Sequence, residues 1–278
     1  MQRISSKDNS LIKHIKRLKE KKYRDEYGEY VVEGLKLIKE AIQENADIKH
    51  IVVCDGCDNS EMIESHLKYE MARLDFTYVP QNIFKMISDV ENPQGVLAVI
   101  GKTRSTIIED DINLNEDIIL ALDDIQDPGN LGTILRTADS VGLKQILVSK
   151  GTADSYNPKV VRSTMGAIFR VRVIECNSLK DSIKKLQNKD YKLMTTSLKA
   201  KKSIYEVDYK KKIIVIGNEA NGVSKEIFNL ADEKVIIPML GKTESLNASV
   251  ATGVILYEYV RQKLNWLNCN LLQIYTLK

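Results

Sequence analysis

Residues 118–142, IILALDDIQDPGNLGTILRTADSVG, contain the pattern that decides the fold. IILAL is an unbroken apolar run, which is typical of a parallel strand that is buried on both faces. Pro128 and Gly129 then make a turn, Asp127 or Asn130 can cap a helix, and apolar residues recur with helical spacing as far as Val141. A strand, a loop and a helix in this order predict an α/β sheet.

The same alternation continues to residue 264, and a shorter alternation precedes it between residues 30 and 100. We therefore predict two α/β domains: a small one over residues 1–104, and one with a largely parallel sheet over residues 116–265. The polar residues 105–115 are predicted to be a linker, and residues 266–278 are a tail without an interpretable pattern. A last helix, over residues 246–264, is apolar on too many sides for a wet surface, which predicts a core helix or a subunit interface.

Composition limits the class of protein. The chain is 43% apolar and 28% charged, which argues against disorder and against a disulfide-dense module. Its longest nearly apolar stretch is too short to span a bilayer, and its first ten residues have no apolar core for export. Four cysteines without an export signal fit a reducing compartment. We expect a cytoplasmic protein with no membrane partner.

Positive charge is concentrated at the start of the chain. Residues 1–24 hold nine Lys or Arg against Asp8 and Glu20, although the net charge of the whole chain is only +3. Such a run is typical of a segment that approaches a phosphate backbone, and a solvated helix face is the alternative. The predicted phosphate contacts are Lys13, Lys16, Arg17, Lys19, Lys21 and Lys22.

Three loops of the second domain follow predicted strands, and ligands of open α/β sheets gather outside the carboxyl ends of the strands. The first loop leads into a helix from which Arg136 projects among apolar residues, so we expect the arginine to be buried against an anion. The second, in IIVIGNEANGVS (213–224), has Gly217, which permits close approach, and Glu219. The third has Ser245 and Asn247 at a helix start, where free N–H groups can hold an anion. Each loop taken alone is also explained as an ordinary turn.

The sequence gives little support to a Rossmann-type small-molecule site or to a zinc site. The GxGxxG fingerprint of a Rossmann site is missing, which argues against a small-molecule enzyme of that type. His50, Cys54, Cys57 and His66 offer a C-x-x-C with two histidines, but their spacing matches no familiar zinc finger. We expect no metal, and we interpret Cys54 as a small apolar residue of a strand.

Together the three loops resemble the motifs of the SpoU/TrmH branch of the SPOUT methyltransferases. The likeness lies in NLGTILRTAD, IGNEANGV and IPM…ESLNASVATG, in the order that the family has them. YVVEGLKLIKEAI and NPQGVLAVI are similar to the family's substrate-binding domain, which resembles a small α/β RNA-binding fold of ribosomal proteins.

The resemblance implies a trefoil knot in the second domain, a homodimer and S-adenosylmethionine as methyl donor. It places Thr196, Gly217, Ile237 and Leu246 at the donor site. It places Asn130, Arg136, Glu219, Ser245 and Asn247 at the reaction centre. Arg136 matches the family's proposed base, but arginine is normally protonated, so anchoring a phosphate is the other role.

We therefore expect an enzyme that methylates a ribose 2′-hydroxyl of RNA, with large-subunit rRNA favoured over tRNA. A non-catalytic RNA-binding dimer is the rival hypothesis.

Overall fold

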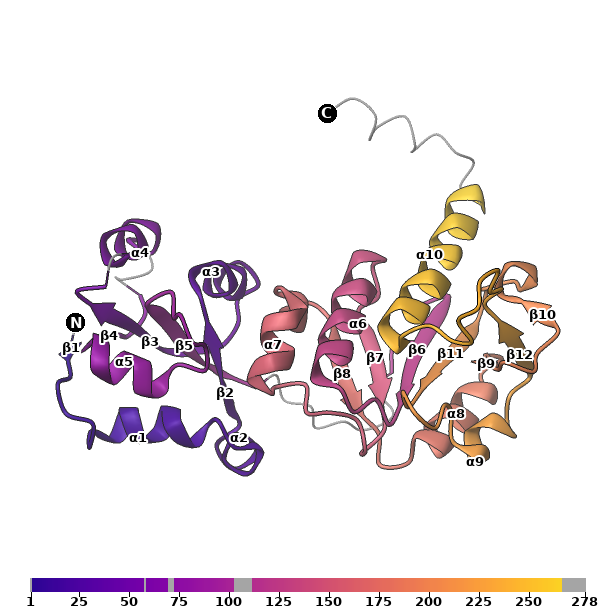
Figure 1. Cartoon of the computed structure of the whole chain (residues 1–278), viewed down its shortest axis with the longest axis horizontal. Helices are drawn as coiled ribbons and strands as arrows, with labels where there is room; N and C mark the ends of the chain where they lie inside the picture. The colour runs from indigo at the N-terminus through magenta and orange to yellow at the C-terminus, as the bar shows by residue number, and fades with distance from the viewer. Residues whose placement is uncertain (1, 58, 70–72, 103–111, 267–278) are drawn as a thin grey trace. The chain divides into compact units, whose positions relative to one another are not determined.

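The computed structural model describes residues 2–57, 59–69, 73–102 and 112–266. It divides into two compact units, one of residues 1–105 and 154–170 and the other of residues 106–153 and 171–278. Both units are α/β, so the predicted fold class is confirmed (Figure 1). Residues 105–111 of the predicted linker and residues 267–278 of the predicted tail lie outside the described residues. The knot stays an expectation from the resemblance.

The first unit is built on a five-stranded mixed sheet in the order β1-β4-β3-β5-β2. β1 and β3 pair with β4 in parallel, whereas β5 runs antiparallel to β3 and β2. Its strands are β1 (Gln2–Arg3), β2 (Glu29–Glu33), β3 (Ile48–Asp55), β4 (Phe76–Pro80) and β5 (Val96–Gly101). Its helices are α1 (Ser10–Arg17), α2 (Lys21–Tyr27), α3 (Leu35–Gln43), α4 (Ser60–His66), α5 (Gln81–Ile87) and α7 (Pro158–Thr164), with the short η3 (Ala167–Phe169).

Alternation along the strands gives this sheet two cores. Ile51 and Val53 of β3 face one core with α3, whereas Val52 and Cys54 face the other with α1 and α5. Figure 1 shows α3 and α4 on one side of the sheet and α1 and α5 on the other. Because Ile12 and Ile15 are fully buried, the opposite face of α1 is left to its basic residues.

Residues 154–170 lie with the first unit, although the predicted boundaries put them in the second domain. Arg24 is 2% exposed and its guanidinium lies 2.6 Å from the Asp154 carboxylate. Tyr30 and Tyr156 pack with ring centroids 4.6 Å apart. A buried arginine needs such an anionic partner, so this pair holds the segment against the first unit.

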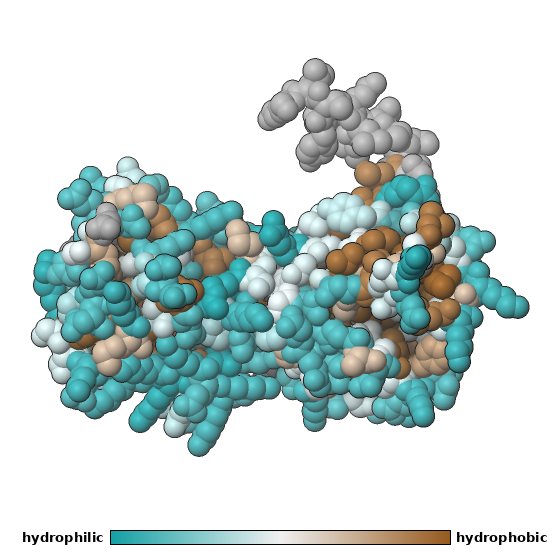
Figure 2. Space-filling view, viewed as in Figure 1, coloured by the Kyte–Doolittle hydropathy of each residue, from teal (hydrophilic) through white to brown (hydrophobic). Residues whose placement is uncertain are grey.

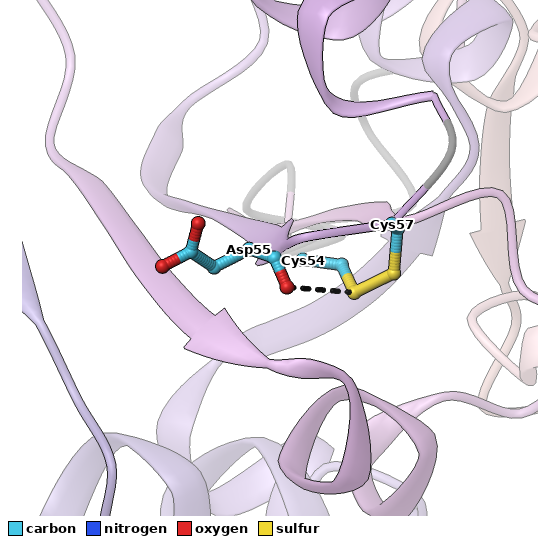
Figure 3. The surroundings of a disulfide bond; sticks show 3 residues. All are labelled: Cys54, Asp55 and Cys57. Carbon is cyan, nitrogen blue, oxygen red and sulfur yellow. Dashed lines mark hydrogen bonds between the residues drawn. A yellow bond between two sulfur atoms is a disulfide. The ribbon is translucent and has the colours of Figure 1, made fainter.

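Cys54 and Cys57 form a disulfide at the end of β3, which Figure 3 shows. Cys54 is a buried residue of β3, as the sequence predicts, but its thiol is not free, because the short turn between the two residues brings its sulfur atom to that of Cys57. Cys176 is buried in the second unit. In the described ranges no group of three or more His, Cys, Asp or Glu side chains is arranged to hold a metal ion.

The second unit is built on a parallel seven-stranded sheet in the order β10-β12-β9-β11-β6-β7-β8. Its strands are β6 (Ile118–Asp123), β7 (Gln145–Val148), β8 (Arg172–Glu175), β9 (Lys192–Thr196), β10 (Lys202–Ser203), β11 (Lys212–Gly217) and β12 (Glu233–Ile236). Its helices are α6 (Pro128–Ser140), α8 (Leu179–Gln187), α9 (Lys225–Phe228) and α10 (Ala248–Trp266), with the short η4 (Ile204–Glu206). Every residue of β6 is buried, as its apolar run predicts.

α8 and α9 cover one face of this sheet, and α6 and α10 lie on the other (Figure 1). α10 buries Ile255, Leu256 and Tyr259, while Val250 and Tyr257 stay about half exposed. No helix within the described ranges has the length and apolar character needed to cross a membrane.

Candidate active site

A cavity of about 750 Å³ opens in the second unit where three neighbouring parallel strands end. Thr196 is the last residue of β9, Gly217 is the last of β11, and Ile237 directly follows β12. These three residues line the cavity together with Leu246. All four positions assigned to the donor site therefore surround one space at the carboxyl edge of the sheet, where ligands of such sheets bind.

Hydrogen bonds join the three loops beside this cavity. The Asn130 side-chain amide donates to Glu219 Oε1 at 2.9 Å, and the Asn247 amide donates to Asn130 Oδ1 at 2.9 Å. Glu219 and Asn247 also line the cavity, whereas Asn130 does not. The structure thus brings three of the five predicted reaction-centre residues into one chain of hydrogen bonds, which we call the amide–carboxylate chain.

Glu219 is the acceptor at the end of this chain. Its carboxylate receives the Asn130 amide and the backbone N–H groups of Gln126 and Asp127, both at 3.2 Å. Partial burial raises the pKa of the Glu219 carboxyl, but these hydrogen bonds together outweigh that effect and leave its pKa below the usual range. A carboxylate held ionised in this way is a weak proton acceptor, so it orients Asn130 rather than acting as a base.

Asn247 occupies the helix start that was expected to hold an anion. Its Oδ1 accepts the backbone N–H of Ser249 at 2.9 Å and the Ser249 hydroxyl at 2.7 Å. The expectation of free N–H groups is therefore wrong for Ser249, because the asparagine caps α10 itself. Ser245 is exposed and lines the cavity.

Arg136 does not reach the cavity of its own chain. It lies six residues after Asn130 on α6, is exposed, and makes no hydrogen bond or ion pair with the described residues. The expectation that it is buried against an anion is wrong, because the apolar residues around it in sequence face the sheet while Arg136 faces away. An unpaired guanidinium on the surface is free to bind a phosphate or another acceptor.

Gly217 is needed for its own loop rather than for space in the cavity. A Cβ on this residue would collide with backbone atoms of Gly222 and Val223. The loop folds back because Asn218 and Gly222 exchange backbone hydrogen bonds of 3.0 and 2.9 Å. A larger residue here is therefore expected to displace the loop that carries Glu219.

Sequence reasoning missed Asn218 as a member of the site. Its side-chain amide donates to the Asp124 carbonyl at 2.8 Å, and its Oδ1 accepts the N–H groups of Ala220 and Asn221 at 3.0 Å. The side chain thus connects the loop after β11 to the loop after β6. Its place directly before Glu219 was the only signal in the sequence.

The predicted RNA contacts of the first unit fall into two groups. Lys19 is held by the Ser88 carbonyl at 2.7 Å and the Asp89 carboxylate at 3.0 Å, and Lys13 pairs with Asp8 at 3.2 Å. The Lys19 ammonium therefore already has acceptors, and it is a weaker candidate for a phosphate contact than the sequence indicates. The others lie on α1 and α2 without a carboxylate within ion-pair distance among the described residues: Lys16, Arg17, Lys21 and Lys22.

The cavity suits S-adenosylmethionine in size and chemistry. Its volume is within the range of small-molecule sites. Its lining combines apolar residues such as Ile216, Ile237 and Leu246 with residues of the loop after β11, which suits a flat adenine ring. The carboxylates of Glu219 and Glu244 add negative charge that favours a cationic sulfonium group.

Two family profiles match the chain. The SpoU rRNA methylase family matches residues 117–257, and the MRM3-like substrate-binding domain matches residues 9–98. The first match contains all three loops around the cavity, and the second contains α1 together with β2, β3 and β4.

Individual proteins match over nearly the whole chain. A 23S rRNA (guanosine(2553)-2′-O)-methyltransferase from Bacillus subtilis is 30% identical over 92% of this chain and 98% of its own length. Among solved structures, an rRNA methyltransferase from Sinorhizobium meliloti bound to AdoMet has a TM-score of 0.81 and 30% identity, covering 94% of this chain and 98% of that one. The SpoU methyltransferase AviRb from Streptomyces viridochromogenes, also with AdoMet, has a TM-score of 0.82 and 27% identity, covering 92% and 98%. The chain belongs to the SpoU rRNA methylase family.

Proposed function

We propose that this protein transfers the methyl group of S-adenosylmethionine to a ribose 2′-hydroxyl of large-subunit rRNA. The observation that carries the proposal is the amide–carboxylate chain of Asn130, Glu219 and Asn247 at the mouth of the cavity. It places oriented amides beside a space that suits the donor. Family membership and the rRNA named for the Bacillus subtilis relative support the same substrate class.

S-adenosylmethionine supplies an electrophilic methyl carbon when it is bound. The protein's task is then to hold the ribose oxygen in line with that carbon and to take up its proton. Asn130 and Asn247 orient the ribose, because Glu219 and the α10 cap fix their amides. Ser245 adds an exposed hydroxyl at the same rim. Thr196, Gly217, Ile237 and Leu246 hold the donor.

Arg136 either anchors a phosphate next to the target ribose or accepts the proton of the ribose 2′-hydroxyl. Its guanidinium is exposed and outside the cavity lining of its own chain, so it acts on RNA bound across the rim or at the cavity of a second copy. Mixing Arg136→Ala with Asn247→Ala protein separates these cases. Partial recovery of activity in the mixture would mean that Arg136 serves the partner's cavity, and no recovery would mean that it serves its own.

The protein is a homodimer in this proposal. Val250 and Tyr257 of α10 are 50% and 55% exposed, and Figure 2 shows apolar side chains gathered over α10. Val250→Asp and Tyr257→Asp should therefore halve the mass found by light scattering. Leu256→Asp is a poorer test because Leu256 is buried within its own unit and its replacement would unfold it. A wild-type mass of one chain at micromolar concentration would overturn the dimer.

The first unit binds the RNA. The test replaces three basic residues of α1 and α2 together by Ala: Lys16, Lys21 and Lys22. For each phosphate contact that the variant loses, the slope of log RNA affinity against log salt concentration should become shallower by about one. Lys19→Ala is the matched control, since its charge is already neutralised by Asp89. If the salt dependence of RNA affinity is unchanged in the triple variant, these lysines do not contact phosphates and form only a solvated helix face.

Mapping 2′-O-methyl groups in total RNA tests the substrate. RNA from cells with and without the gene should differ at a nucleotide of large-subunit rRNA, and the position named for the Bacillus subtilis relative is the first to inspect. A difference confined to tRNA would favour the other substrate class. A protein that binds rRNA but lacks donor affinity would be the non-catalytic dimer. An rRNA substrate is consistent with a cytoplasmic location for the enzyme.

A further inference from the structure

A second cavity of about 750 Å³ lies in the first unit, where the sequence predicted no site. It is enclosed by the first turns of α1, by the residues around β1, and by the starts of β3 and β4. None of the residues that line it belongs to the amide–carboxylate chain or to the donor cavity.

The cavity combines an apolar floor with polar walls. Ile4 and Phe76 are buried, and Leu11 and Leu74 are half-buried. Four side chains that can form hydrogen bonds with a polar ligand line the same cavity, and Asp75 is exposed: His14, Glu29, His50 and Asp75. An apolar surface with a few polar groups converging on it is the usual construction of a site for a flat organic ligand.

Two of the polar groups are available to a ligand. His14 Nε2 lies 2.6 Å from the Glu29 carboxylate, so these two hold each other in place. The side chains of His50 and Asp75 make no hydrogen bond with other described residues. A half-buried imidazole offers a flat face for stacking, and an unpaired carboxylate offers two acceptors.

The charges favour a nucleobase over a phosphate. Glu29 and Asp75 bring two carboxylates to the walls, and the Lys49 ammonium already lies 2.8 Å from Asp47. A phosphate would meet net negative charge here, whereas an N–H-rich base edge would find acceptors. Lys16 lies two residues after His14 on α1 and has no carboxylate within ion-pair distance among the described residues, so it can meet a backbone phosphate of the same nucleotide segment.

We propose that this cavity binds one unpaired nucleotide of the RNA substrate whose base carries an exocyclic amino group. The base lies on the apolar floor, stacks on His50 and donates its amino hydrogens to Asp75. RNA-binding proteins read unstacked bases in this way, through aromatic faces and the Watson–Crick edge. The inference rests on the proposed function for the identity of the ligand as RNA, and it assigns sequence recognition to the first unit.

The three histidines of the chain provide a direct test, because His14 and His50 line the cavity and His66 does not. In the full-length protein with labelled histidine, the imidazole signals are followed by NMR while GMP, CMP, AMP or UMP is added. We expect His14 and His50 to shift with the first three nucleotides while His66 stays in place. UMP should bind at least about fivefold more weakly, because its base has no amino group.

Asp75→Asn should weaken GMP binding by about tenfold, since it replaces a charged acceptor by a neutral amide. Asp25→Asn, which changes an exposed carboxylate outside the cavity, is the matched control. Three results would overturn the proposal: no shift of His14 and His50, equal affinity for UMP, or the same shifts with inorganic phosphate alone. Methyl transfer to rRNA is measured separately, so a failure of this inference and a failure of the proposed function are distinguishable.

Discussion

Replacing Gly217 with alanine adds one methyl group at the end of β11, where it would collide with the backbone of Gly222 and Val223. A backbone clash cannot be relieved by a side-chain rotation, so we place its cost near the upper end of the usual range for overpacking, about 2–3 kcal/mol. The loop would have to open to accommodate it. Opening moves Glu219, which ends the amide–carboxylate chain, and it also changes the wall of the donor cavity.

Gly222→Ala is the matched variant in the same loop. Gly222 has φ +69° but open space around its Cβ position, so alanine there costs only the left-handed strain of roughly 1–2 kcal/mol. Amide hydrogen exchange of residues 218–223 reports the opening directly. Gly217→Ala should speed exchange by roughly 30- to 150-fold. This range follows from the cost of about 2–3 kcal/mol, because about 1.4 kcal/mol corresponds to a factor of ten in the opening equilibrium. Calorimetry should show a parallel loss of S-adenosylmethionine affinity. Equal exchange in the two variants, or none faster than in the wild type, would refute the clash as the reason for glycine.

Substitutions at three further positions test the roles of single side chains. Asn218→Asp removes the hydrogen bond to the Asp124 carbonyl and sets two carboxylates side by side, so turnover should fall. Turnover should fall less in Asn218→Ser, because serine can still accept hydrogen bonds from the loop N–H groups. Arg136→Ala should keep donor binding and lower turnover by about 10²- to 10⁴-fold, and Arg136→Lys should recover little if a two-pronged phosphate interaction matters; full activity would remove Arg136 from the centre. Because the folded state lowers the pKa of Glu219, its ionised form contributes stability above the unfolded-state pKa that is lost as pH falls through the folded-state pKa. Glu219→Gln should reduce that acid dependence, and an unchanged pH profile of unfolding would contradict the assignment.

The sheet of the second unit follows from local sequence. IILAL and IIVI became the buried strands β6 and β11, and their pairing in register brings Gly217 opposite Asp123. Once neighbouring strands are parallel, their carboxyl ends meet at one edge. The loops of the site were therefore predictable as a group before any of their interactions was known.

Details that depend on tertiary structure were not predictable. α9 extends only over Lys225–Phe228, after a turn in which Asn218 and Gly222 exchange backbone hydrogen bonds, and the sequence pattern does not show where this turn ends. Helical spacing places Arg136 among apolar neighbours but does not show that it points away from them. The grouping of residues 154–170 with the first unit involves contacts between residues far apart in sequence, such as the ion pair between Arg24 and Asp154.

The most direct test of the account is transfer of labelled methyl groups from S-adenosylmethionine to large-subunit rRNA taken from cells that lack the gene. After digestion to nucleosides, we expect the label on a ribose 2′-oxygen, and we expect Asn247→Ala, which breaks the hydrogen bond to Asn130, to reduce its incorporation strongly. Label on a base, or no transfer by a protein that binds the donor, would contradict it.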